Sequence, residues 1–284
     1  MVDFVIKYKI HIEMENPYKT ALNIYFDRLI KLRHNVDWIN MQLLNSITEY
    51  TKLDDDQLIS GSSLIISDIT GPTDRGWTIN FYTGHKNITM AKEYEKEIHR
   101  LISIESCYAF AQSFEGLERF FKDIVWQKTQ ICPSFFDEIK DIEKDGKKIG
   151  FIENVRAKYP GGDKLFGFVK KATGKDFLSS SQTNNYNLSF SEFWCVLSIV
   201  RHAITHSQSI IRKALVFKSL THKSLFNHFF ICHECDQNNI EIRLNYDKLE
   251  KLIKSIAEFS FQIFKILSIQ KDYEWAINNN NVTR

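Results

Sequence analysis

The chain has 284 residues, of which 43% are hydrophobic, and its formal net charge is +2. This composition suffices for a buried core in one large or two small domains, without metal or disulfide staples. A charge this close to neutral gives no overall positive field for nucleic acid, so any RNA contact has to come from a local patch.

The sequence carries no pattern for export or membrane insertion. Its first residues lack the apolar run and cleavage site of a signal peptide, and no segment approaches the roughly 18 consecutive apolar residues of a membrane span. Five scattered cysteines, an odd number, indicate a reducing compartment. We therefore expect a cytoplasmic protein without membrane contact.

Residues 1–86 predict an α+β region that would specify a substrate or a partner. Residues 2–12 alternate apolar and polar side chains, which is typical of a half-buried strand. Residues 17–50 keep apolar side chains at helical spacing. Two further strands, 64–69 and 77–83, flank a turn rich in glycine and proline and predict a small antiparallel sheet.

Residues 87–284 predict a helical domain. Helical periodicity runs over 89–130 and again over 246–269. Around 134–187 we expect an insertion broken by glycine and proline, consisting of helices over 135–144, 151–159 and 164–174 and a polar loop over 179–187.

Within the insertion, a small basic and aromatic patch is formed by Lys164, Lys170, Lys171, Lys175, Phe166 and Phe168. Such a patch can contact phosphates and stack bases. The alternative is a solvated face above two core phenylalanines.

The segment Ser189–Lys213 is predicted to form an apolar helix that carries polar, titratable side chains. Ser189 and Glu192 stand as S-x-x-E, the capping box at a helix start. An apolar stripe follows at spacings of three, four and seven, formed by Phe193, Val196, Leu197, Val200, Ile204 and Ile211. It identifies the side of the helix that faces the core.

Arg201, His202 and His206 interrupt this helix with one fixed positive charge and two groups that titrate near neutral pH. That combination suits a site that holds a phosphate and moves a proton. His202 and His206 share a face, whereas Arg201 and His206 lie about 140° apart around the helix. One alternative is that these are surface groups or satisfied core groups on an ordinary helix. Another is a His202–His206 metal pair, although Ala203 stands where H-E-x-x-H has its glutamate.

Two glutamates on the preceding long helix are candidate partners for the motif. Glu118 can pair with Lys122 on its own surface. Alternatively, Glu115 or Glu118 bonds Arg201 or a histidine and orients it, because buried charges are kept only when paired.

Residues 229–244 predict a hairpin with its turn near 236–239. Cys232 and Cys235 form one C-x-x-C pair here, and His222 and His228 lie upstream as possible further ligands. A structural zinc usually needs two ligand pairs at recognisable spacing, so ordinary hairpin cysteines are the favoured interpretation.

Arg201-His202-x3-His206 resembles the Arg-polar-x(3 to 5)-His motif of the HEPN superfamily, and Ser113–Val125 resembles the glutamate-bearing helix of many HEPN domains. The resemblance covers roughly residues 89–270. It implies a mainly α fold, which for this chain means an HEPN-like helical bundle with a small antiparallel β element in the N-terminal region and a C-terminal β-hairpin. Many members are metal-independent ribonucleases of toxin–antitoxin and antiviral defence systems.

The resemblance implies an endoribonuclease in which two protomers bring their motif helices together on RNA, without a cofactor. Arg201 would bind the scissile phosphate, and His206 would promote attack by the 2′-hydroxyl or protonate the leaving oxygen. His202 would orient the arginine or share proton transfer. Glu115, Glu118 and Thr205 would be supporting residues. Independently of the resemblance, the positive charges of Arg212, Lys213, Lys170 and Lys171 make them the candidate RNA-binding residues.

The alternative function is a non-catalytic HEPN-like module that binds a nucleotide, an antitoxin or another regulatory protein. P-loop, G-x-G-x-x-G, G-x-S-x-G and EF-hand patterns are absent from the sequence. Nucleotide hydrolysis, dinucleotide redox chemistry and serine esterase activity therefore have no support.

Overall fold

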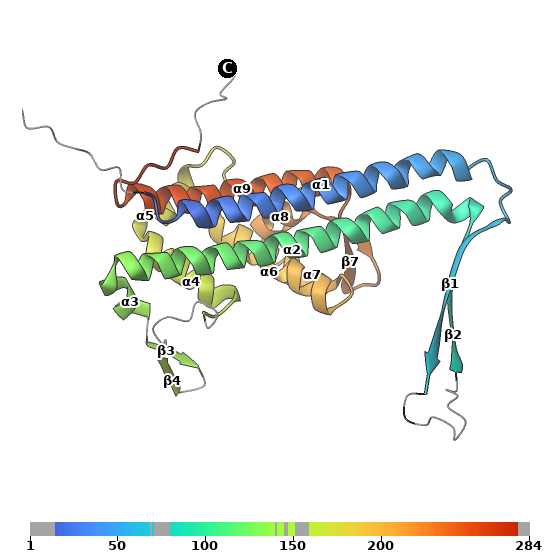
Figure 1. Cartoon of the computed structure of the whole chain (residues 1–284), viewed down its shortest axis with the longest axis horizontal. Helices are drawn as coiled ribbons and strands as arrows, with labels where there is room; N and C mark the ends of the chain where they lie inside the picture. Colours follow the sequence, from blue (N-terminus) through green and yellow to red (C-terminus); the bar gives the residue numbers. More distant parts are fainter. Residues whose placement is uncertain are drawn as a thin grey trace, which may run out of the picture.

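Three long helices lie side by side and form the frame of the computed structural model: α1 (Lys19–Tyr50), α2 (Tyr94–Ile131) and α9 (Tyr246–Ile269) (Figure 1). The described residues are mainly helical, with a two-strand antiparallel sheet in the N-terminal region and a small three-strand antiparallel sheet near the C-terminus, which confirms the predicted mainly α fold class with its two β elements. The residues that the structure describes are 15–68, 70, 80–139, 141–144, 147–150 and 159–277. The predicted strand over 2–12 lies outside them.

The predicted helix over 17–50 is confirmed as α1, and its buried side chains follow helical spacing. Tyr25 stacks on Phe120 of α2 at 5.6 Å between ring centroids. The two helices approach closely at Gly116, where a Cβ atom would lie 2.9 Å from the Tyr25 ring. Side chains of α1, α2 and α9 share one buried cluster. The division of the chain between residues 86 and 87 stays a prediction.

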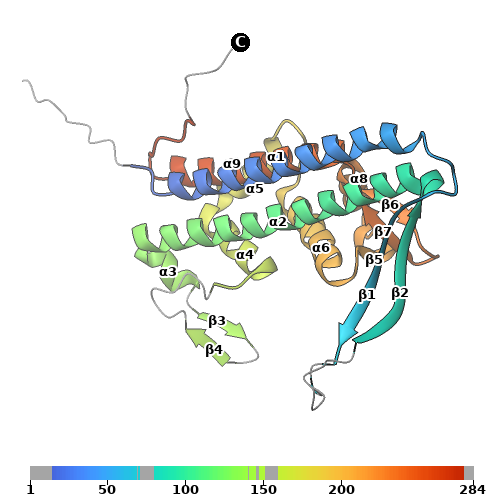
Figure 2. The same cartoon turned by 45° about the vertical axis from the view of Figure 1, so that its right-hand side comes forward.

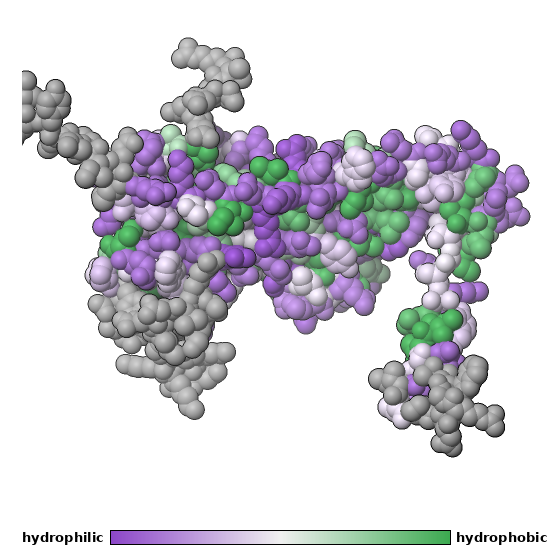
Figure 3. Space-filling model, in the orientation of Figure 1, coloured by the Kyte–Doolittle hydropathy of each residue, from purple (hydrophilic) through white to green (hydrophobic). Residues whose placement is uncertain are grey.

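Strands β1 (Leu58–Ser67) and β2 (Asn80–Met90) form an antiparallel hairpin that projects from the helices (Figures 1 and 2). The antiparallel sheet is as predicted, but both strands start or end well beyond the expected limits. Most of their side chains are exposed, and apolar ones gather on the hairpin (Figure 3). A short 3-10 turn, η1 (Ala91–Glu93), leads into α2.

The insertion contains α3 (Pro133–Ile139), α4 (Gly162–Thr173) and α5 (Lys175–Thr183). The predicted helix over 135–144 is wrong in its second half, because β3 (Asp141–Lys144) pairs with β4 (Lys147–Gly150) as a hairpin. The predicted helix over 151–159 falls almost entirely outside the described residues. Residues 179–183, expected in a loop, are the end of α5.

Helix α6 (Phe190–His206) carries the motif. Ser189 caps it as predicted, since its hydroxyl accepts a hydrogen bond from the Glu192 amide at 3.4 Å. The helix ends at His206 rather than Lys213, because Gln208 and Ser209 adopt positive φ angles of 52° and 65° and reverse the chain. Residues 210–212 then form a strand instead of helix.

The C-terminal part follows α6 with β5 (Ile210–Arg212), α7 (Lys213–Val216) and α8 (Leu220–Phe229). The predicted hairpin is confirmed as β6 (Ile231–Glu234) and β7 (Asn239–Arg243), with β5 added beside β7. The predicted final helix is confirmed as α9. In the described part of the chain, no helix is long and apolar enough to cross a membrane.

An aromatic cluster fixes α6 against α2 and α4. Trp194 of α6 is 1% exposed, and its ring lies 4.8 Å from Phe114, 5.4 Å from Phe121 and 4.8 Å from Phe166. Its indole Nε1–H donates to Asp163 at 3.2 Å, so the buried nitrogen has a partner. This packing sets how the exposed side of α6 points outward at the motif.

Candidate functional site

The motif occupies the last two turns of α6. His202 and His206 are exposed, and their ring centroids lie 4.8 Å apart, as four-residue spacing on a helix requires. Thr205 is also exposed, but its hydroxyl donates to the carbonyl oxygen of Arg201 at 2.9 Å. This bond occupies the Thr205 proton within the helix, so the imidazole pair is the group offered to solvent.

Arg201 points toward α2. Its Nη2 lies 3.2 Å from Glu115 Oε1, and the two side chains are 25% and 48% exposed. The predicted contact between a glutamate of the preceding helix and Arg201 is therefore present, with Glu115. A pair this exposed is worth about 0–1 kcal/mol, so its main effect is to orient the guanidinium. Arg201 Nε is shielded and has no hydrogen-bond partner.

Glu118 lies one turn further along α2 and does not reach the motif. Its Oε1 accepts a hydrogen bond from the Gly162 amide at 2.7 Å, at the first residue of α4. A Cβ atom at the preceding Gly161 would lie 3.3 Å from this oxygen. Glu118 therefore stabilises the start of α4, where free amides favour a carboxylate.

Arg201 and His206 do not converge within one chain. Among the described residues, no hydrogen bond or ion pair joins Arg201 to His202 or His206. Their separation around the helix explains this, because the arginine faces α2 while the imidazoles face outward. The structure therefore brings together two pairs, Arg201 with Glu115 and His202 with His206.

A cleft of about 570 Å³, here called the motif cleft, opens beside His202. One wall is α6, through Ser198 and Ile199. The other walls come from later elements, through Ile210, Arg212, Leu215 and Asn239. Sequence reasoning identified Arg212 but missed Ile199, Leu215 and Asn239, because nothing local places a strand and a short helix against α6.

The four predicted RNA-binding cations do not form one patch. Arg212 is exposed at the motif cleft, whereas Lys213 pairs with Glu234 at 2.9 Å. Lys170 lies 4.8 Å above the Phe166 ring. Lys171 donates to the carbonyl oxygen of Glu138 in α3. Helix α3 follows the end of α2, and that end lies about 24 Å along α2 from Glu115, so Lys171 is remote from the motif.

The four residues considered as zinc ligands, Cys232, Cys235, His222 and His228, do not form a metal-binding cluster. Cys232 and Cys235 are both exposed. His222 is buried and its Nε2 contacts the carboxylate of Glu192. In the described parts of the chain, no group of three or more histidine, cysteine or acidic residues is placed to hold a metal ion.

The cysteines give a direct test of the fold. Burial raises the pKa of Cys107 to about 12, so its thiol stays protonated and unreactive at pH 8. The side chain is also shielded from reagents in solution. A hydrogen bond with Ser134 lowers the pKa of Cys132. We expect iodoacetamide at pH 8 to label Cys132, Cys232 and Cys235 of the native protein, and Cys107 only after unfolding, as peptide mass spectrometry would report. Rapid native labelling of Cys107 would contradict the packing of α2.

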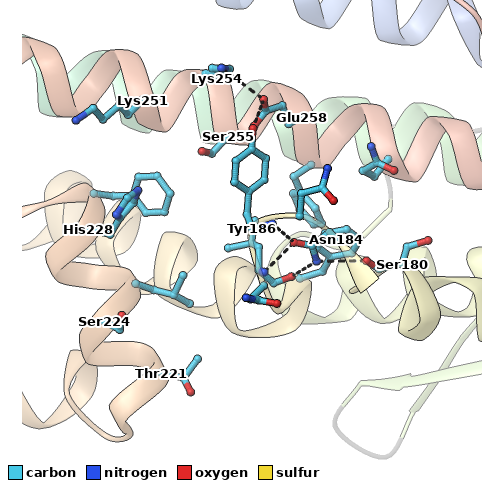
Figure 4. Close-up of a pocket in the computed structure, with 18 of the residues that line it drawn as sticks. Ser180, Asn184, Tyr186, Thr221, Ser224, His228, Lys251, Lys254, Ser255 and Glu258 are labelled. Atoms are coloured by element: carbon cyan, nitrogen blue, oxygen red, sulfur yellow. Dashed lines mark hydrogen bonds and ion pairs between the residues drawn. The ribbon is translucent and has the colours of Figure 1, made fainter. Parts of the chain in front are cut away.

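A second, larger groove of about 1030 Å³ is enclosed by three parts of the chain (Figure 4). These are helix α8, helix α9 and the loop that follows α5. Its walls carry Ser224 and His228 from α8 and Lys251 and Lys254 from α9. Figure 4 shows Tyr186 extending across the groove toward Glu258, and its hydroxyl lies 3.5 Å from that carboxylate. Sequence reasoning expected a polar loop here but did not identify the lysines.

Asn184 holds the loop of the larger groove in place. Its Oδ1 accepts hydrogen bonds from the amides of Tyr186 and Leu188, at 3.2 and 2.8 Å. Its Nδ2 donates to the carbonyls of Ser181 and Leu188, each at 2.9 Å. The loop that presents Tyr186 is therefore fixed by one side chain.

Neither the known protein-family models, nor the curated proteins, nor the solved structures contain a match to this chain. The HEPN resemblance therefore rests on the motif residues themselves.

Proposed function

We propose that the protein is a metal-independent endoribonuclease of the HEPN type that acts as a homodimer, in a toxin or antiviral defence role. One observation carries the proposal: two exposed imidazoles and an arginine oriented by Glu115 share one end of α6, beside an accessible cleft. Cleavage of RNA by attack of a 2′-hydroxyl needs a fixed positive charge that binds the phosphate and accessible groups that transfer protons. Arg201 provides the first and the two histidines provide the second.

In the proposed reaction, the 2′-oxygen attacks the adjacent phosphorus while the bond from phosphorus to the 5′-oxygen breaks. One imidazole accepts the proton of the 2′-hydroxyl, and a protonated imidazole gives a proton to the 5′-oxygen. The products are a 2′,3′-cyclic phosphate and a free 5′-hydroxyl. The guanidinium of Arg201 binds the charge that develops on the phosphate oxygens.

The contact between the two rings favours shared proton transfer as the role of His202, in preference to orienting the arginine. Glu115 already orients Arg201, and His202 lies against His206 instead. Because Arg201 and His206 of one chain face different ways, a second protomer is needed to bring an arginine and an imidazole to the same phosphate. A neutralising antitoxin would act by covering this surface.

Purified protein is expected to cleave mixed cellular RNA into fragments with cyclic phosphate ends, and a chelator is expected to leave the rate unchanged. The physical reason is that every step uses side chains of the chain itself. Gel electrophoresis with and without EDTA measures this, with elemental analysis of the same preparation as the control. Loss of cleavage in EDTA that returns with a divalent cation would contradict a metal-independent mechanism.

The second candidate function is a non-catalytic binding module, and the larger groove favours it. Lys251 adds positive charge there, Lys254 is paired with Glu258 at 3.9 Å, and Tyr186 offers a ring beside the two lysines. A protein that binds nucleotides without cleaving RNA would show a thermal shift with nucleoside phosphates that Tyr186→Ala removes. Cleavage of RNA by the wild-type protein, lost in motif variants, separates the first function from the second.

A further inference from the structure

The motif cleft is built by a small sheet that returns the chain to α6. Strand β5 pairs with β7 so that Arg212 lies opposite Asn239, and cross-strand partners share a face of a sheet. Both residues line the cleft, together with Ile210 two positions before Arg212. The pairing therefore fixes one cation, one amide and one apolar side chain on the wall that faces α6.

The turn between α6 and β5 is held by the backbone. Gln208 and Ser209 have positive φ angles, and the Ser209 amide donates to the carbonyl of Ala203 at 3.1 Å. The carbonyl of Ser209 accepts from the Ile242 amide at 2.8 Å. Because both sides of the turn are bonded, the cleft exists before any ligand binds.

The lining of the motif cleft suits a nucleobase joined to a phosphate. Ile210 and Leu215 are 42% and 50% exposed and offer apolar surface to a flat ring. Asn239 Nδ2 donates one hydrogen bond to Asp236 at 2.8 Å, which leaves its second N–H and its amide oxygen for the edge of a base. None of the residues that line the cleft is acidic, and Arg212 is exposed at it. A volume of about 570 Å³ is within the range of small-molecule sites.

We propose that the motif cleft receives the base of the nucleotide beside the cleaved phosphate and thereby sets which nucleotide the protein cuts next to. This proposal rests on the proposed nuclease function. Arg212 binds the adjoining phosphate, Ile210 and Leu215 contact the faces of the base, and Ser198 and Asn239 contact its edge. A base can enter only when it is unpaired, because a base in a duplex has to be flipped out at a cost of a few kcal/mol.

The first test measures binding without cleavage. The His206→Ala protein is titrated with a fluorescent single-stranded oligoribonucleotide and with the same sequence in a duplex, at one salt concentration. We expect at least tenfold tighter binding of the single strand. Adding Arg212→Ala should weaken single-strand binding about tenfold. It should also reduce the slope of log affinity against log salt concentration by the amount expected for about one lost phosphate contact. Lys31→Ala, which removes an exposed cation of α1, is the matched control.

The second test maps cleavage. Leu215→Trp narrows the cleft at a half-exposed position where a larger side chain can be accommodated, so the protein should fold. Sequencing of RNA ends is expected to show a changed nucleotide preference beside the cut, with overall activity retained on some sequences. The same sites cut at the same rates by wild type, Leu215→Trp and Arg212→Ala would overturn the proposal and leave the nuclease standing.

Failure of the nuclease itself gives a different result. If the wild-type protein cuts no RNA, the proposed function falls, and the binding titration alone decides the cleft. Single-strand binding that Arg212→Ala and Leu215→Trp weaken would support a base pocket without catalysis. Binding that neither variant changes, or that favours the duplex, would overturn the base pocket as well.

Discussion

Replacing His206 with alanine is expected to reduce RNA cleavage by a factor of about 100 to 10,000, which is the usual contribution of a general acid or base. His206 is exposed at the end of α6, so the change in the free energy of unfolding should stay within about 0.5 kcal/mol. Cleavage of a fluorescent RNA and a thermal melt of the same sample measure the two effects. His34→Ala, an exposed histidine on α1, is the matched control and should cleave as wild type does.

Mixing two inactive proteins tests whether the site is shared between subunits. Arg201→Ala and His206→Ala should each be inactive alone. After the two are unfolded together and refolded, mixed dimers hold one intact arginine and one intact histidine on different chains, so part of the activity should return. Mixtures that stay inactive would show that the site lies within one chain. Full activity of His206→Ala alone would remove the catalytic role of that residue.

Replacing Trp194 with alanine is expected to lower the free energy of unfolding by about 3–5 kcal/mol. The ring is buried among Phe114, Phe121 and Phe166, so its removal leaves a cavity between α6, α2 and α4. Its Nε1–H bond to Asp163 is lost as well. Urea unfolding followed by circular dichroism gives the difference from wild type.

Trp38→Ala is the control for this prediction, because Trp38 is a tryptophan on α1 that is 57% exposed. Its removal should change the free energy of unfolding by no more than about 0.5 kcal/mol. Equal effects of the two substitutions would mean that α6 is not packed through its aromatic side chains. The geometry of the motif would then have no rigid support.

The long helices could be predicted from the sequence because each has one buried face, and spacing reports burial. The Ser189 cap was also readable, since it depends on residues three apart. The end of α6 was not, because Ile211 continues the apolar spacing although it belongs to β5. The predicted bounds of β1 and β2 were wrong because almost all side chains of these strands are exposed. Without a buried face, the alternation of apolar and polar residues does not mark where a strand begins or ends.

The candidate site was predictable in its residues and less so in its contacts. The motif named Arg201, His202 and His206, but the choice between Glu115 and Glu118 depends on where α4 begins, and only the fold decides that. The motif cleft needs the β5–β7 register, which joins residues about 30 positions apart. Such non-local placement leaves no trace in local periodicity.

The described residues of β1 and β2 supply no side chain to the buried cluster that joins α1, α2 and α9. A protease that nicks this arm would therefore leave both fragments associated and the helical frame intact. The segment between Tyr50 and Tyr94 is accordingly free to lengthen, shorten or change in composition at little thermodynamic expense, which makes it the natural place for a chain of this architecture to diversify.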